Sequence, residues 1–174
     1  MALSMPLPTT LAHVGALVAV LLKLGPDGNA ESRAHLARVA MAAQVDGIVI
    51  SNTSAERPDT LASAHRAEKG GLSGAPLRAQ ALRACAELYV LTEGKLPIIG
   101  VGGIDSGAAA YERIRAGASL LQLYTALVYS GPGLVDSIHA ELRERLEADG
   151  FATLGDAVGV DAARIAAAAA AADR

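Results

Sequence analysis

Short hydrophobic runs alternate with longer amphipathic stretches along most of the chain. Each run is five to seven residues long and rich in leucine, isoleucine or valine, as is typical of buried β-strands. The predicted strands are residues 17–23, 47–51, 97–101 and 119–124. The amphipathic stretches between and after them have the length and the apolar spacing of α-helices. The predicted helices are residues 30–44, 77–92, 105–116 and 134–149.

Capping and stop signals set the bounds of these helices. Asn29 can cap the first helix, and Asp105 or Ser106 the third, because a short polar side chain can accept a hydrogen bond from an N–H group of the first turn. Gly94 and Gly117 follow the second and third helices, where glycine commonly ends a helix. The predicted apolar face of the first helix consists of Leu36, Val39 and Ala40.

The order of these elements predicts an α/β fold with parallel strands. Uninterrupted apolar strands separated by helices indicate strands that are buried on both faces, as in a barrel or a doubly wound sheet. No G-x-G-x-x-G motif follows the first strand, which disfavours dinucleotide binding. Four β/α units amount to half of a TIM-type barrel, whose complete form takes about 250 residues. The alanine-rich tail, residues 160–174, is expected to be a helix or a frayed end with little capacity to specify packing.

Composition and charge exclude several classes of protein. The chain has 174 residues, enough for one domain, and its net charge of −3 with no basic stripe argues against nucleic-acid binding. Cys85 is the only cysteine, and the four histidines show no ligand spacing, so neither a disulfide nor a metal site is expected. The apolar run at residues 11–22 is too short to span a membrane, and the first ten residues lack a basic region. By itself the chain is therefore predicted to be soluble and cytoplasmic.

Polar residues or glycines follow each predicted strand. In parallel α/β barrels the active site lies just past the carboxyl ends of the strands. Glycines before a helix let a phosphate approach backbone N–H groups, although they also serve a simple tight turn. A lysine at a strand tip can offset negative charge on a ligand or be an ordinary surface residue, and an asparagine can bind a planar ring or form a turn. The residues at these positions are Lys23, Ser51, Asn52, Thr53, Gly102, Gly103, Tyr124 and Thr125.

Several segments resemble the second half of the class 2, quinone-dependent dihydroorotate dehydrogenases. The segments are NTSAERP, GGLSGAPLR, LPIIGVGGIDSG, IRAGASLLQLYTAL and the GPG that follows. The resemblance implies that residues 16–159 are the C-terminal half of a flavin-binding (β/α)8 barrel. It leaves residues 1–15 as an unmatched N-terminal segment and residues 160–174 as a tail.

The resemblance implies an enzyme that uses flavin mononucleotide (FMN) to oxidise dihydroorotate to orotate in pyrimidine (UMP) biosynthesis and that reduces a quinone. Lys23 would then lie at the pyrimidine end of the flavin and stabilise its anionic reduced form. Asn52 and Thr53 resemble the residues that hydrogen-bond the orotate ring. The other implied flavin contacts are Ser51, where the family usually has threonine, Gly74, Gly102, Gly103, Tyr124 and Thr125. The family also implies peripheral attachment to the cytoplasmic side of the inner membrane in a bacterium, although these residues contain no anchor.

One departure from the family concerns the catalytic base, a serine in the first half of the family's barrel, which nothing here matches. We therefore expect this chain to supply binding and charge stabilisation but no catalytic residue, and to be inactive alone. One alternative is a non-catalytic half barrel that binds flavin or phosphate, or an inactive remnant. Another is a different phosphate-binding barrel enzyme, which would not need the N-T-x(4)-P or GGLSG segments. A half barrel with open sheet edges could also self-associate.

Overall fold

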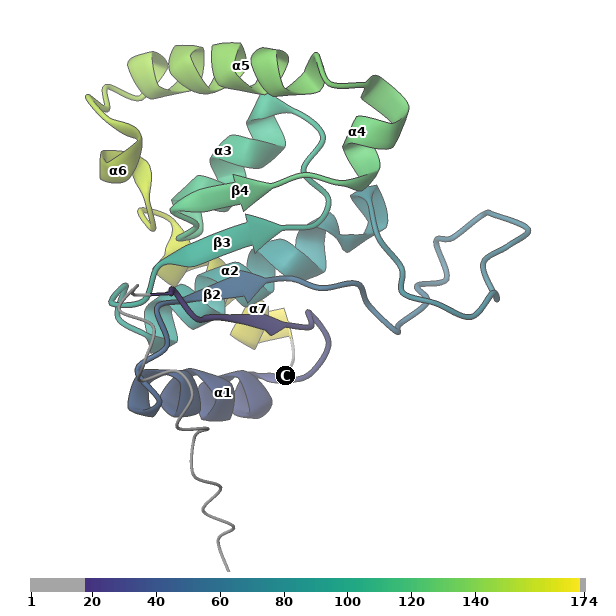
Figure 1. Ribbon diagram of the computed structural model, residues 1–174, viewed down its shortest axis with the longest axis horizontal. Helices are drawn as coiled ribbons and strands as arrows, with labels where there is room; N and C mark the ends of the chain where they lie inside the picture. The colour runs from purple at the N-terminus through teal and green to yellow at the C-terminus, as the bar shows by residue number, and fades with distance from the viewer. Residues whose placement is uncertain (1–17, 173–174) are drawn as a thin grey trace, which may run out of the picture.

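The computed structural model describes residues 18–172 and has a four-stranded parallel sheet at its centre (Figure 1). The strand order is β1-β2-β3-β4, so each strand pairs with the next one along the chain, and the sheet is not closed into a barrel. The strands are β1 (Leu21–Leu24), β2 (Gly47–Ile50), β3 (Ile98–Val101) and β4 (Leu120–Gln122). This architecture confirms the prediction of parallel β/α units. The N-terminal segment 1–15 and the predicted start of the first strand at residue 17 lie outside the described residues.

The four predicted helices are present, with bounds within two residues of those expected. They are α1 (Ala30–Ala42), α2 (Arg78–Leu91), α3 (Gly107–Arg115) and α5 (Leu134–Ala148). Asn29 caps α1 as predicted, since its Oδ1 accepts a hydrogen bond from the Ser32 N–H at 2.9 Å. Ser106 rather than Asp105 caps α3, through a 3.3 Å hydrogen bond from the Ala109 N–H. The capping signals therefore located the helix starts correctly.

Three short elements escaped the sequence prediction. They are the 3-10 turn η2 (Ala75–Leu77), α4 (Thr125–Ser130) and α6 (Leu154–Ala157). Each is at most six residues long, too short for an apolar repeat to show. A capping box between Thr153 and Asp156 starts α6, and this pair of residues was the one available signal.

The helices between residues 18 and 172 cover one face of the sheet. The side chains of Leu24, Ile48 and Ile98 point to that face and form the core with α1 and α2. Both faces of β2 and β3 are buried, as predicted, but the prediction is wrong for β1 and β4. Leu21 is 44% exposed and Leu120 is 62% exposed. These two edge strands have a neighbour on one side only, and no described element lies over their second face.

The packing of α1 corrects its predicted apolar face. Ala37 and Ala40 are buried against the core and Leu36 packs beside them, whereas Val39 is 47% exposed. Small residues let α1 lie close to α2, and Arg33 of α1 forms a buried ion pair with Glu87 of α2.

The alanine-rich tail forms α7 (Ala162–Ala172), which lies along α2 on the helix-covered side of the sheet (Figure 1). Ala162 is buried and Ile165 packs against the core, while Asp161 pairs with Arg115 at 2.6 Å. The expectation of little packing capacity is therefore wrong, because alanines allow two helices to approach closely. Within residues 18–172, no helix is both long enough and apolar enough to cross a membrane.

Candidate functional site

A cavity of about 710 Å³ opens at the carboxyl ends of the four strands. All four strands point the same way, so the loops that follow them gather at this end, together with α4 (Figure 1). The cavity brings together every residue singled out in the sequence. The nine residues are Lys23, Ser51, Asn52, Thr53, Gly74, Gly102, Gly103, Tyr124 and Thr125.

Strands β1 and β2 present a cation and a hydroxyl group to the cavity. Lys23 lies in β1 beside Val49 of β2, one residue before the strand ends, and its ammonium makes no ion pair with any residue between 18 and 172. Ser51 directly follows β2 after a cis peptide bond and is buried, and its Oγ has no hydrogen-bond partner in the described chain. Buried hydroxyl groups are normally hydrogen-bonded, so this one is positioned for a ligand.

Two glycines after β3 form a turn with unusual backbone angles. Gly102 and Gly103 have φ values of +99° and +68°, in the region that favours glycine. Gly103 and Ile104 both line the cavity, and neither backbone N–H donates to an acceptor within the described residues. Gly103 and Ile104 are buried, and buried N–H groups without an acceptor are rare. The turn therefore offers two donors to an anion.

Two arginines that the sequence analysis did not single out hold the carbonyl groups of this turn. Arg113 of α3 is 1% exposed and donates to the carbonyl oxygens of Val101 at 2.9 Å and Gly102 at 3.0 Å. Arg78, at the start of α2, donates to the Gly103 carbonyl oxygen at 3.0 Å. Burial lowers the pKa of Arg113 from its ordinary value. No local sequence signal marks Arg113, because its burial on α3 follows from tertiary packing.

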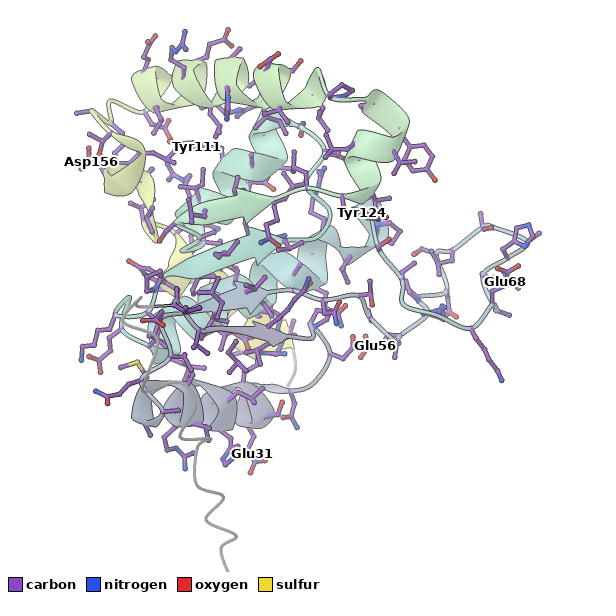
Figure 2. All side chains as sticks on the ribbon, viewed as in Figure 1. Glu31, Glu56, Glu68, Tyr111, Tyr124 and Asp156 are labelled. Atoms are coloured by element: carbon purple, nitrogen blue, oxygen red, sulfur yellow. The ribbon has the colours of Figure 1, made fainter. Side chains whose placement is uncertain are left out.

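The long loop between β2 and α2 closes another side of the cavity. Thr125 of α4 donates its hydroxyl proton to Ser73 Oγ at 2.9 Å, which ties the loop to α4. Gly74 has a φ of +83° and lies close to Thr125. Tyr124 lies where β4 leads into α4 and is 79% exposed (Figure 2).

Asp27, in the loop after β1, anchors the start of the long loop. Its carboxylate accepts hydrogen bonds from the Ser54 hydroxyl, from the Ala55 N–H at 2.8 Å and from the Gln80 amide at 3.2 Å. Burial pushes the pKa of Asp27 upward, but these three hydrogen bonds outweigh burial and hold it below the usual value. Asp27 therefore fixes the chain directly after Asn52 and Thr53.

The arrangement suits an elongated ligand with a planar polar ring and an anionic end. Lys23, Asn52 and Thr53 lie on the β1 and β2 side of the cavity, and the donor turn after β3 lies beyond Ser51. No histidine or aspartate of the described chain hydrogen-bonds Ser51, so the cavity has no serine nucleophile with its base. Within residues 18–172, no three His, Cys, Asp or Glu side chains come together as a metal site would require.

Comparison with known proteins identifies relatives of this fold and sequence. The family model described as dihydroorotate dehydrogenase matches residues 7–146. A Rhodospirillum rubrum protein named dihydroorotate dehydrogenase (quinone) is 56% identical over 142 residues, which cover 82% of this chain and 39% of that protein. The mitochondrial dihydroorotate dehydrogenase (quinone) of Mus musculus is 50% identical over 143 residues, covering 82% of this chain and 36% of that protein.

A solved structure has a similar fold. The crystal structure of DHODH in complex with ferulenol from Eimeria tenella aligns with a TM-score of 0.82 and 38% sequence identity. The alignment covers 86% of this chain and 40% of that one. The chain thus spans less than half the length of each of these relatives.

Proposed function

Because the chain belongs to the dihydroorotate dehydrogenase family, we propose that it forms the FMN-binding side of an enzyme that oxidises dihydroorotate to orotate and reduces a quinone. The observation that carries the proposal is that one cavity is lined by all nine residues for which the resemblance to the family implies a ligand contact, from Lys23 at β1 to Thr125 at α4. The reaction belongs to the synthesis of pyrimidine nucleotides.

The residues of the cavity fit FMN in two independent ways. The buried Ser51 hydroxyl has no partner in the described chain, as expected of a group that contacts a bound ring. Gly103 and Ile104 line the cavity and their N–H groups have no acceptor in the described chain, as expected of donors to a phosphate. Gly74, Gly102, Tyr124 and Thr125 would complete the contacts along the flavin chain and its phosphate.

The residues of this chain would bind, orient and stabilise charge. The chemistry that bound FMN supplies is the acceptance of a hydride from the substrate. The Lys23 ammonium would offset the negative charge that develops at the pyrimidine end of the ring, and its lack of an ion-pair partner among residues 18–172 leaves it available. Asn52 and Thr53 would hydrogen-bond the substrate ring and hold it in line. The proton that leaves the substrate would go to a base outside the nine residues.

Three further properties belong to this proposal. The relatives are named dihydroorotate dehydrogenase (quinone), so a quinone is the proposed electron acceptor here. The proposal also includes peripheral membrane attachment, on the cytoplasmic side of the inner membrane in a bacterium. The exposed edge-strand residues Leu21 and Leu120 favour self-association of this chain with a second copy.

The decisive experiment is flavin binding by the purified protein. The protein is incubated with FMN, passed through gel filtration, and examined by visible absorption. We expect flavin bands that co-elute with the protein. In the whole enzyme, meaning a protein that also contains the first half of the barrel, we expect dihydroorotate to bleach the bound flavin in the absence of oxygen. The Lys95→Ala variant should bind FMN like the wild type, because Lys95 is exposed and pairs only with Glu93 in the described chain.

Two results would overturn parts of the proposal. Protein that elutes without flavin after incubation with FMN far above micromolar concentration would overturn the proposal that FMN is the cofactor. Bound flavin that dihydroorotate does not bleach in the whole enzyme would leave the chain as a flavin-binding module and overturn the reaction.

A further inference from the structure

The glycine turn after β3 owes its orientation to a buried guanidinium group. Arg113 reaches from α3 beneath the turn and is 1% exposed. Its Nη1 donates to the Val101 carbonyl, and its Nη2 donates to the carbonyls of Gly102 and of Arg78, the latter at 3.4 Å. Burying a charge is costly unless it is paired, yet no carboxylate within residues 18–172 forms an ion pair with Arg113. The energetic cost of burying the Arg113 charge therefore indicates that Arg113 has a function.

The hydrogen bonds to the carbonyl groups of the turn also set the direction of its N–H groups. In a trans peptide the carbonyl of one residue and the N–H of the next point in opposite directions, and the peptides of this turn are trans. Arg113 holds the Gly102 carbonyl, so the Gly103 N–H points away from it. Arg78 holds the Gly103 carbonyl, so the Ile104 N–H points away as well. Neither of these two N–H groups donates to an acceptor in the described chain, and both residues are buried.

We propose that Arg113, assisted by Arg78, is a positioning residue for the anionic end of the cofactor: Arg113 holds the Gly102 carbonyl and Arg78 holds the Gly103 carbonyl, and together they present the N–H groups of Gly103 and Ile104 to a phosphate. This inference rests on the proposed function, since the phosphate is that of FMN. The positive charge of Arg113 acts in the same direction, because it lies behind the donors in a buried region where charge is weakly screened.

The two arginines divide the work differently. Arg113 is fully enclosed and contacts the carbonyls of residues 78, 101 and 102, so it also connects the turn to the start of α2. Arg78 is partly exposed and forms an ion pair with Asp105, so its charge is already compensated. We therefore expect the larger effect at Arg113 and a smaller one at Arg78.

The test compares two ligands that differ only in the phosphate. Dissociation constants for FMN and for riboflavin are measured by flavin fluorescence in the purified protein and in its Arg113→Met, Arg113→Lys and Arg78→Met variants. We expect Arg113→Met to weaken FMN binding at least about tenfold and riboflavin binding less than about twofold, since buried carbonyls left without donors lose the turn's geometry. Arg113→Lys keeps the charge without the planar fork and should restore FMN binding in part. Arg78→Met should weaken FMN binding about threefold.

Arg115→Met is the matched control on the same helix. Arg115 pairs with Asp149 and Asp161 on the opposite side of α3, so its loss should lower the melting temperature but leave the FMN-to-riboflavin affinity ratio unchanged. If Arg113 had only a structural role, Arg113→Met would weaken FMN and riboflavin binding equally. An unchanged FMN-to-riboflavin affinity ratio in this variant therefore overturns the inference. If Arg113→Met does not fold, an unchanged ratio in Arg78→Met overturns it instead. Wild-type protein that binds neither flavin would overturn the proposed function itself.

Discussion

In the proposed function, single side chains at the carboxyl ends of the strands carry the chemistry, and Lys23 is the clearest case. Its ammonium lies on β1 at the cavity and pairs with no carboxylate between residues 18 and 172. A cation placed where negative charge develops contributes most to the reaction step and less to ligand affinity.

Replacing Lys23 therefore separates binding from reaction. In the whole enzyme, we expect Lys23→Ala to slow flavin reduction by dihydroorotate by roughly 10²-fold while the protein keeps most of its FMN. Stopped-flow absorbance measures the reduction, and the flavin-to-protein absorbance ratio measures retention. Lys95→Ala should change neither quantity. Unchanged reduction kinetics in Lys23→Ala would remove the charge-stabilising role.

Asp27 makes a residue-scale prediction about acid stability. We expect Asp27→Asn to lower the free energy of unfolding at pH 7 by about 1–2 kcal/mol, because an amide accepts weaker hydrogen bonds than a carboxylate. The folded-state pKa of Asp27 lies below its usual value, so the stabilisation is present above about pH 4 and is lost as the pH falls further. Urea unfolding at pH 7 and pH 3 should show a difference between wild type and variant that shrinks at pH 3. An equal difference at both values would contradict this role.

At the scale of elements, the glycine turn constrains how η2 and α2 pack. A Cβ atom on Gly103 would lie 2.5 Å from Arg78 Cα and 2.7 Å from Arg78 N, which are backbone atoms and cannot swing aside. The glycine at this position therefore serves the close approach of β3 and α2 as well as the cavity.

A pair of alanine substitutions distinguishes this contact from backbone strain. We expect Gly103→Ala to lower the free energy of unfolding by about 2–4 kcal/mol, through its positive φ and its clash with Arg78, and to lower FMN retention. Gly131→Ala has a similar φ of +74° with nothing within 4 Å of the added Cβ, so it should cost only about 1–2 kcal/mol. Urea denaturation of both variants gives the comparison. Equal losses would show that strain alone explains Gly103.

Local patterns were sufficient to predict the strands, the four long helices and the positions around the cavity. Strand ends in a parallel sheet meet at one edge, so Lys23, Ser51 and Tyr124 could be expected together before any contact was known. The buried role of Arg113 was not predicted, because a charged helix residue ordinarily faces solvent and only tertiary packing reverses that. The exposure of Val39 and Leu120 also depends on which elements lie over them, and this is not encoded in the local sequence.

At the scale of the whole molecule, the sheet of the described chain has one face covered by helices, a second face that is exposed along the edge strands β1 and β4, and two edges without a described partner strand. In α/β proteins, parallel sheets are usually covered on both faces. Leu120 stands on the open face of edge strand β4, opposite Ile99 of β3.

We expect the purified protein to self-associate through this face at micromolar concentration. Leu120→Glu should weaken the association at least about tenfold, because it replaces an apolar contact with a charge that resists burial. Val90→Glu, on the exposed side of α2, is the matched control and should leave the association unchanged. Sedimentation velocity over a concentration series gives the result. A wild-type protein that stays monomeric throughout would contradict the prediction.

The packing of α7 along α2 has a consequence for how the protein is made. Ala162 and Ile165 complete a core whose other members lie between residues 22 and 121. On the ribosome, the part of this core beside α2 therefore stays incomplete until residues 162–172 have emerged, although every described strand has been synthesised by then. During that interval the nascent chain exposes apolar surface along α2. The need for a chaperone should therefore fall when the alanine-rich helix packs against α2.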